Sequence, residues 1–381
     1  MPFDLSRHPY FTSWTDPQSG VESFILTDRV APVQQSFYYT NPSLSADGRW
    51  LWFYCAHPPN PVRTLAAVCM DPAEPRIEWF PEAGFDAASP MLATEGDAAY
   101  FTAGPTVFKK TLGRDGVEAV CTLADEYVAN RQLEGLATHL SLSADGRYFL
   151  LDGRVGLNTW FVAMGEPATG EVRLLHELDR RYNHALFSPV DANLCILSQD
   201  WMFDPHTGQA TTVDIRTWLM DVRQTRFEPL VPGLWFKHNA WPCHEWFSAD
   251  GLVCWTDYEA GVFECDPAAD AALRKAVHVW PRALCHSHCD PTRRYYVADQ
   301  TPYKWHERPC EVLFFDRQTG KETHIVTALP PRPPLARSPR LYHIDPHPQV
   351  SPDGAFVVYT TTVRGAVDVA VAPLGAITAR L

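Results

Sequence analysis

The sequence predicts an all-β fold, a seven-bladed β-propeller with four strands per blade, and three observations lead to it. A short turn motif recurs seven times, each copy precedes a run of strand-forming residues, and proline provides 33 of the 381 residues. Internal repeats of about 40–50 residues are typical of propellers. A high proline content disfavours long helices and favours short strands joined by turns. We expect residues 1–381 to form one domain.

The repeated turn has the form Ser-Ala-Asp-Gly in its best copies and is followed by an apolar run such as Trp50–Tyr54. The seven copies begin at Ser45, Thr94, Ser143, Ser188, Ser248, Asp290 and Ser351. Such turns beside β-rich runs predict hairpins. A second turn type, rich in Asp, Pro, Thr and Gly, alternates with the first, as in 203–208 and 315–320. Two hairpins per repeat give the four strands of a propeller blade.

The two ends of the chain predict how the ring closes. Residues 15–20 form a turn of the second type before a strand-like run at 21–26, with no first hairpin ahead of them. The last repeat, after Gly354, lacks an obvious outer strand. We therefore expect the N-terminal strand to complete the last blade, which leaves no open sheet edge. The alternative of two β-sandwiches lacks a linker, since the proline-rich stretch 329–334 is short enough to be a loop.

Composition excludes several classes of function. The net charge of −13 disfavours binding to nucleic acid or to an anionic membrane. No apolar run approaches the roughly 18–20 residues of a membrane helix, and the N-terminus does not resemble a secretory signal. The ten cysteines are scattered, which predicts free thiols and a cytoplasmic protein. A monomer or a weak homo-oligomer is expected.

One position of the repeat is rich in histidine. The residue seven places before the turn glycine, or four before the turn serine, belongs to the strand that lines the channel of a propeller. In chain order this position holds Asn41, Ser89, His139, His184, His244, His286 and His347. Five of the seven are histidine, although the whole chain has only 15. Each alone could be a satisfied core residue, but equivalent positions converge on one space and predict metal binding or proton transfer there.

Two segments refine this prediction. In 285–289 the order Cys-His-Ser-His-Cys places His286 and His288 on one face of a strand and both cysteines on the other, which argues against a single Cys/His zinc site. In 342–349 strand alternation gives His343, Asp345 and His347 a common face. Residues two apart are separated by roughly 6.6 Å, so Asp345 and His347 could share an ion, whereas His343 could join them only through a bend.

At these residues the sequence resembles the oligogalacturonate lyases, seven-bladed propellers that cleave short pectin fragments by β-elimination. The similarity covers most of the chain, and its specific pieces are 214–219, 243–247, 285–288 and 345–348. The resemblance implies that His244 is the base that removes the C5 proton and that Arg216 stabilises the developing charge. It implies that His286 and His347 bind a divalent ion, most often Mn²⁺, with Ca²⁺ and Zn²⁺ as alternatives. The implied partner is an acidic oligosaccharide.

The sequence departs from that family at the ion site. The family's first histidine of a His-Pro-His-Pro run is Asp345 here, and its glutamine ligand aligns with Tyr342, beside which His343 offers a substitute. Aspartate suits hard cations, so an ion site can persist. His184 is a further catalytic candidate, as a proton donor to the leaving group. The candidates for substrate binding are His139, His288, Tyr303, Lys304, Arg337 and Arg340. A lyase for another uronic linkage, such as rhamnose-glucuronate, and a sugar-binding propeller without catalysis remain as alternatives.

Overall fold

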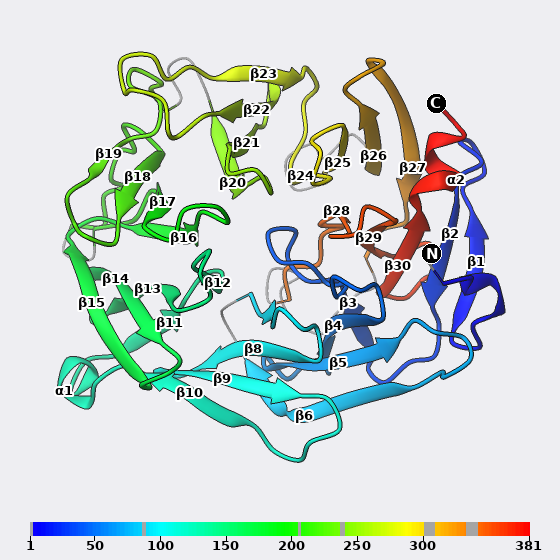
Figure 1. Cartoon of the computed structure of the whole chain (residues 1–381), viewed down its shortest axis with the longest axis horizontal. Helices are drawn as coiled ribbons and strands as arrows, with labels where there is room; N and C mark the ends of the chain where they lie inside the picture. The colour runs from blue at the N-terminus through cyan, green and yellow to red at the C-terminus, as the bar shows by residue number, and fades with distance from the viewer. Residues whose placement is uncertain (1–2, 86–88, 205–206, 237–240, 301–308, 333–341) are drawn as a thin grey trace.

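The computed structural model describes residues 3–85, 89–204, 207–236, 241–300, 309–332 and 342–381. Seven antiparallel sheets surround a common centre and follow one another in chain order, so the predicted seven-bladed propeller is confirmed (Figure 1). Five of the blades have four strands, and the third and the seventh each have a fifth strand. The position at which histidine recurs lies within the first strand in the fourth and fifth blades and outside it, in the adjoining chain, in the other five.

The first blade holds β3–β6 (Val33–Gln35, Trp50–Ala56, Arg63–Cys69, Ile77–Phe85), and the second holds β7–β10 (Met91–Leu92, Ala98–Ala103, Thr106–Thr111, Glu118–Thr122). The third blade holds β12–β15 (Ser141–Leu142, Phe149–Val155, Thr159–Glu166, Glu171–Leu178), with β11 (Leu133–Leu136) beside β13. The fourth blade holds β16–β19 (Tyr182–Phe187, Leu194–Gln199, Thr217–Asp221, Phe227–Pro229). The fifth, sixth and seventh blades hold β20–β23 (Pro242–Phe247, Val253–Asp257, Gly261–Cys265, Val277–Trp280), β24–β27 (Ser287–Cys289, Tyr295–Gln300, Cys310–Asp316, Lys321–Leu329) and β28–β30 (Gln349–Val350, Phe356–Thr361, Asp368–Pro373). The helical pieces in the described residues are short: η1 (Leu5–Arg7), α1 (Asp125–Val128) and α2 (Leu374–Thr378).

The seventh blade is closed by the N-terminus, as predicted, but with two strands instead of one. Strand β2 (Glu22–Leu26) pairs with β30 in the register Phe24 to Val371, and β1 (Phe11–Thr15) pairs with β2 on the outside. The two termini therefore lie close together in the ring (Figure 1). Joining the first and last parts of the chain in one sheet locks the ring, because opening it would break this pairing.

The repeated turn has the geometry that its residues dictate. In the first blade the Ser45 hydroxyl donates to Asp47 Oδ1 at 2.6 Å, and the Gly48 N–H donates to the Ser45 carbonyl at 2.8 Å. Gly48 has φ of 71°, a left-handed conformation that glycine adopts without strain. The same pair of contacts recurs in blades three, five and seven. In the sixth blade Arg293 occupies the glycine position with φ of 55°.

The hydrophobic core lies between neighbouring blades. Leu51 and Phe53 of the first blade pack with Val358 and Val369 of the seventh, and all four are buried. Similar clusters join the other blades, for example the fifth to the sixth. This arrangement is typical of propellers, where sheets stack face to face around the axis. Of the helices in the described residues, none has the length and apolarity needed to cross a membrane.

Candidate active site

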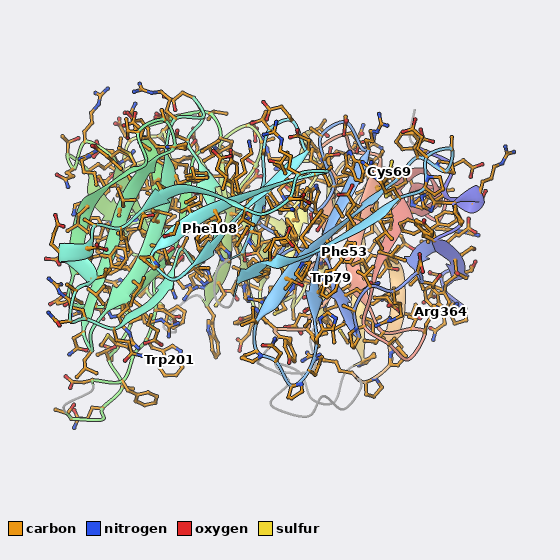
Figure 2. All side chains as sticks on the ribbon, turned by 90° about the horizontal axis from the view of Figure 1, so that it is seen from below. Phe53, Cys69, Trp79, Phe108, Trp201 and Arg364 are labelled. Carbon is orange, nitrogen blue, oxygen red and sulfur yellow. The ribbon has the colours of Figure 1, made fainter. Side chains whose placement is uncertain are left out.

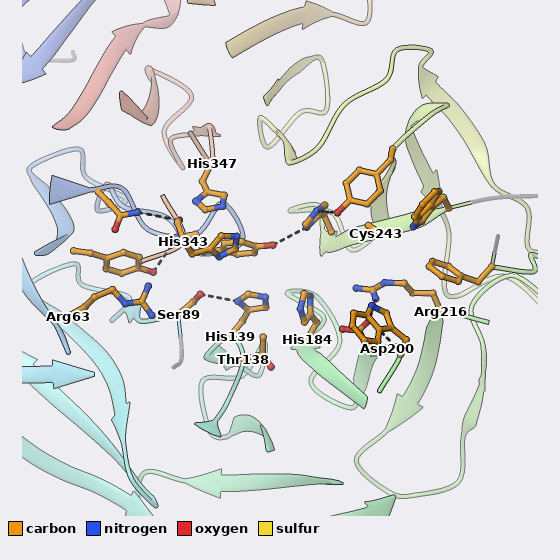
Figure 3. A pocket seen from close by; sticks show the side chains of 18 residues that line it. Arg63, Ser89, Thr138, His139, His184, Asp200, Arg216, Cys243, His343 and His347 are labelled. Atoms are coloured by element: carbon orange, nitrogen blue, oxygen red, sulfur yellow. Dashed lines mark hydrogen bonds and ion pairs between the residues drawn. The ribbon is translucent and has the colours of Figure 1, made fainter. Parts of the chain in front are cut away.

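A cavity of about 600 Å³ lies at the centre of the ring (Figure 3). Six of the predicted site residues line it: His139, His184, Arg216, His244, His343 and His347. Trp201, another lining residue, stands at the lower rim in the edge-on view, which marks the face on which the cavity lies (Figure 2).

Local backbone geometry turns the histidines toward the centre. His184 and His244 have φ of 54° and 56°, and the pairing of β16 with β17 and of β20 with β21 shifts register at these positions. A β-bulge of this kind interrupts the alternation of the strand and redirects a side chain. His347, just before β28, also has positive φ, at 44°. Non-glycine residues in this region are uncommon and often belong to functional sites.

Four residues of the sixth and seventh blades bring potential ligand atoms together. His286, His343, Asp345 and His347 each offer one such atom, and all lie within 4.8 Å of one another. The ring centroids of His286 and His347 are 4.3 Å apart, and those of His343 and His347 are 4.9 Å apart. His347 Nε2 is buried and has no hydrogen-bond partner among the described residues. An orphaned imidazole nitrogen beside a carboxylate and two further imidazoles fits a divalent ion.

Asp299, which the sequence analysis missed, orients two of these histidines. It lies at the inner end of β25, and both its carboxylate oxygens are 3.1 Å from His286 Nδ1. It also accepts the backbone N–H groups of His286 and His347, both at 3.0 Å. A carboxylate behind a ligand histidine fixes the ring and leaves Nε2 for an ion. Burial acts to lower the pKa of His286, but Asp299 outweighs it and raises that pKa.

The segment 342–348 bends, which settles where His343 lies. The segment is not a strand, His343 has φ of 48°, and the Asp345 N–H donates to the His343 carbonyl at 3.1 Å. This turn brings His343 into the group with Asp345, as the alternative requiring a bend predicted. Tyr342 points elsewhere: its side chain is buried and its hydroxyl donates to the Asn60 carbonyl at 2.7 Å. His343, and not Tyr342, therefore provides the potential ligand atom from this end of the segment.

His244 lies next to this group, and both its ring nitrogens contact tyrosine. Its ring centroid is 4.3 Å from that of His286. Nδ1 is 3.0 Å from the Tyr38 hydroxyl, and Nε2 is 2.7 Å from the Tyr258 hydroxyl. Burial, with His286 nearby, lowers the pKa of His244 well below its usual value, so the ring is neutral at neutral pH. A neutral imidazole can accept a proton.

Arg216 is held in an ion network before β18. Its Nε donates to Glu245 Oε1 at 2.8 Å, and its Nη1 donates to Asp200 Oδ1 at 3.3 Å. Arg216 and Glu245 are buried, with 6% and 0% of their surface exposed. The guanidinium therefore lies at the cavity as predicted, but two carboxylates already oppose its charge.

His139 and His184 form a pair that is not part of the group of four potential ion ligands. Their centroids are 4.8 Å apart, and Tyr38 stacks on His139 at 4.6 Å. His139 Nδ1 is 3.0 Å from the Ser89 hydroxyl. Burial lowers the pKa of both histidines well below the usual value. Both rings are therefore neutral at neutral pH, and His184 is a poor proton donor there.

Two expectations for 285–289 need correction. His286 precedes β24, so strand alternation does not extend to it, and Cys285 Sγ lies 3.9 Å from His286 Nε2 and 3.7 Å from His244 Nε2. His288 lies in β24, and its Nδ1 accepts the Val350 N–H at 3.1 Å, so it joins the sixth blade to the seventh and does not line the cavity. We therefore do not retain His288 as a substrate-binding candidate. The candidates Tyr303, Lys304, Arg337 and Arg340 lie outside the described residues.

The repeat contains a second informative position that the sequence analysis did not use. Six places after the turn glycine, or after its equivalent Arg293, the second strand carries a polar residue in six of the seven blades: Tyr54, Thr102, Asp152, Asp257, Asp299 and Thr360. The fourth blade, counted from Asp191, has Leu197 there. Each of the six polar residues contacts backbone near a first strand or loop of a blade. The same counting that found the histidines would have found Asp299. Tyr38, Tyr258 and Arg63, which also line the cavity, lie off the repeat phase and have no such signal.

Two solved structures match the chain over nearly its whole length. An oligogalacturonate lyase in complex with manganese matches with a TM-score of 0.74 at 16% identity, covering 98% of this chain and 97% of that one. An oligogalacturonate lyase from Vibrio parahaemolyticus matches with a TM-score of 0.76 at 15% identity, covering 96% of both chains. The chain has the fold of the oligogalacturonate lyases.

The other comparisons set the limits of this similarity. A prolyl endopeptidase matches with a TM-score of 0.51 at 15% identity, covering 91% of this chain but 50% of that one. No protein-family model and no curated protein matches the sequence. The likeness to the oligogalacturonate lyase fold therefore concerns the fold, and function has to be argued from the site.

Proposed function

We propose that this protein is a metal-dependent lyase that cleaves short uronate-containing oligosaccharides, with oligogalacturonides as first choice, by β-elimination. One observation carries the proposal: a group of four potential ion ligands lies beside a neutral, half-buried histidine in a cavity large enough for sugar residues. Elimination from a uronate needs both parts, because the C5 proton is weakly acidic and its removal places charge on the carboxylate. The fold shared with two oligogalacturonate lyases supports the same choice.

We assign the ion to His286, His343, Asp345 and His347, and propose Mn²⁺ as the resident ion. When bound, a divalent cation supplies Lewis-acid stabilisation for charge that develops on a carboxylate. The residues present suit this role, since Asp345 provides a hard oxygen ligand and the imidazoles suit transition metals. The match to a manganese-bound structure supports the choice of ion. Arg332, 2.7 Å from Asp345 Oδ1, holds that carboxylate in place.

We assign proton removal to His244. With the Tyr38 oxygen accepting from Nδ1–H, Nε2 is the basic nitrogen, and the C5–H bond breaks as Nε2 takes the proton. The C4=C5 double bond forms and the C4–O4 bond breaks, leaving its electron pair on O4. We assign the O4 proton to the Tyr258 hydroxyl, which lines the cavity 2.7 Å from Nε2, and His244 then returns its proton to Tyr258. Burial raises the pKa of Tyr258, so its hydroxyl remains protonated, whereas burial lowers the pKa of His184, so that its acidic imidazolium form is not populated at neutral pH.

We assign substrate carboxylates to the cationic edge of the cavity. Arg63 lines it with its guanidinium carbon 5.3 Å from the Tyr54 ring centre, and Arg216 lines it from the fourth blade. Arg216 contributes less than a free guanidinium because Glu245 and Asp200 share its charge. His139 is retained as a substrate contact. All ten cysteines are free, which supports a reducing compartment such as the cytoplasm.

The proposal is tested by incubating the purified chain with a panel of acidic oligosaccharides. Di- and trigalacturonate are expected to yield an unsaturated uronate that absorbs in the ultraviolet. A chelator is expected to abolish the signal, added Mn²⁺ to restore it, and elemental analysis to find one ion per chain. A matched control is His278→Ala, which removes an exposed imidazole on the outer strand β23 and should leave all three results unchanged.

Two outcomes would redirect the proposal. Product from a glucuronate-containing oligosaccharide but not from galacturonates would assign the other uronic linkage. Binding of acidic sugars without any conjugated product, in the presence of Mn²⁺, would overturn the lyase and leave a sugar-binding propeller.

A further inference from the structure

A second group of potential ligand atoms lies beside the first. His244 Nε2, Cys285 Sγ and one nitrogen of His286 lie within 4.8 Å of one another, and Cys285 and His286 are buried. The sulfur is 3.7 Å from His244 Nε2 and 3.9 Å from His286 Nε2. Zinc–sulfur and zinc–nitrogen bonds of about 2.3 and 2.0 Å in a tetrahedron place sulfur and nitrogen about 3.5 Å apart. The three side chains are thus already near the spacing of a zinc site.

The two groups share one atom and therefore compete. The Nδ1 atom of His286 is 3.1 Å from both oxygens of Asp299, so only Nε2 is left to bind an ion. His286 belongs both to the group with Asp345 and to the group with Cys285, so this one nitrogen is what it can offer to either group. A single imidazole nitrogen binds one ion at a time, so an ion in one position removes a ligand from the other.

The donor chemistry of the two groups differs. The first contains a carboxylate and suits a harder ion such as Mn²⁺, whereas the second contains a thiol and suits thiophilic ions. Cys289, also buried and four residues further along the chain, packs instead in the apolar cluster between the fifth and sixth blades. The second group also includes His244, the residue to which we assign proton removal.

We propose that His244, Cys285 and His286 form a second, inhibitory ion site that selects Zn²⁺ and similar thiophilic divalent ions over Mn²⁺. On binding, the metal–sulfur bond forms as the Cys285 thiol releases its proton to solvent, and His244 Nε2 exchanges its hydrogen bond with Tyr258 for the metal. The fourth position faces the cavity that His244 and Tyr258 line. The inhibitory consequence rests on the proposed function, whereas the ion site itself does not.

The site is tested by spectroscopy on the full chain after removal of bound metal with a chelator. Co²⁺ is the probe, since a cobalt–thiolate bond gives a charge-transfer band in the near ultraviolet. We expect one equivalent of Co²⁺ to produce the band in the wild type and in the matched control Cys289→Ser, and Cys285→Ser to lack it. Zn²⁺ affinity is expected to fall by more than about tenfold in Cys285→Ser, because the soft ligand is lost, while Mn²⁺ affinity changes by less than about twofold.

Two results would overturn the site. One is a wild-type chain saturated with Co²⁺ that shows no thiolate band, which needs no variant to fold. The other is a band that persists in Cys285→Ser or Cys285→Ala. In the activity arm, Zn²⁺ added to the Mn²⁺-loaded chain is expected to inhibit turnover, and Cys285→Ser to resist. If no uronate is cleaved under any condition, the proposed function fails while the spectra still decide the site.

Discussion

Blades one to four and blades five to seven contribute the same repeat position to the centre, yet the two halves differ. In the first half Asn41 and Ser89 bind protein groups: the Asn41 amide donates to the Pro90 carbonyl at 2.7 Å, and the Ser89 hydroxyl lies 3.0 Å from His139 Nδ1. In the second half His286 and His347 belong to a group of potential ion ligands. The repeat position thus brings a side chain to the centre but does not by itself make it a ligand.

The supporting carboxylate accounts for much of the difference. Asp299 in the sixth blade contacts the Nδ1 atom of His286 and leaves Nε2 for an ion. Asp152, at the same repeat position in the third blade, instead accepts the N–H and hydroxyl of Thr138, at 2.8 and 2.5 Å. His139 therefore has no carboxylate behind it and turns to Ser89. We infer that the residue on the second strand, Asp299 or Asp152, sets whether the central histidine of its blade has a carboxylate to orient it.

The largest expected effect separates the halves by loss of the ion. His286→Ala removes the atom shared by both ligand groups and is expected to abolish Mn²⁺ binding and lower turnover by about 10³-fold or more, since a catalytic ion contributes several kcal/mol. His139→Ala, the equivalent change in the third blade, is expected to keep the ion and to raise KM. Elemental analysis and the ultraviolet assay measure both. Equal loss of metal in the two variants would contradict the comparison.

The next effect separates two roles within the second half. His244→Ala is expected to retain Mn²⁺ and to lower kcat by about 10²–10⁴-fold, as removal of a positioned general base does. The ion remains because His343, Asp345 and His347 are untouched. Isothermal titration with Mn²⁺ and turnover of trigalacturonate provide the measurement. Loss of the ion together with turnover would show that His244 is a ligand of the resident ion.

A smaller effect is expected from the carboxylates behind the ring. Asp299→Asn keeps the shape but weakens the contact with His286 Nδ1, and we expect Mn²⁺ affinity to fall by about 10–100-fold. Asp152→Asn is the matched control at the same repeat position and is expected to leave Mn²⁺ affinity unchanged. Both are measured by metal titration after chelation. Identical affinities in Asp299→Asn and the wild type would remove the explanation given for the difference between the halves.

Repetition made most of the fold predictable. Seven copies of a turn gave the blade count, and the unmatched turn at 15–20 gave the closure, because the same residues meet the same backbone demands in each copy. The central histidines followed from the same counting. The second N-terminal strand was not predicted, since β1 has no partner in the repeat.

The site was predicted only where it follows the repeat. The Tyr38 hydroxyl contacts His244, although the two residues are 206 positions apart in the chain. A contact at this separation cannot be predicted from a local sequence pattern. Cys285 was assigned to the wrong face because alternation was extended to two residues that precede the start of β24 at Ser287. The turn at His343 depends on a positive φ of 48° at a residue other than glycine, and the composition of the segment does not predict that angle. Where the backbone is irregular, the period-two pattern of a strand no longer predicts which way a side chain points.

The smallest expected effect on the site concerns Asp152, whose influence we expect in stability alone. Burial raises the pKa of Asp152 from 3.8 to about 6, against the hydrogen bonds from Thr138. The folded protein therefore holds this proton more tightly than the unfolded chain, and the resulting stability is present below about pH 4 and lost as the pH rises through 6. Relative to Asp152→Asn, the wild type should lose up to about 3 kcal/mol of unfolding free energy between pH 4 and 7, since one pKa unit is about 1.4 kcal/mol. Urea unfolding of both proteins at each pH measures the difference, in which other titrating groups cancel. A difference that stays constant across this range, or that grows with pH, would contradict a raised pKa for Asp152, and the contrast between the two halves would need another cause.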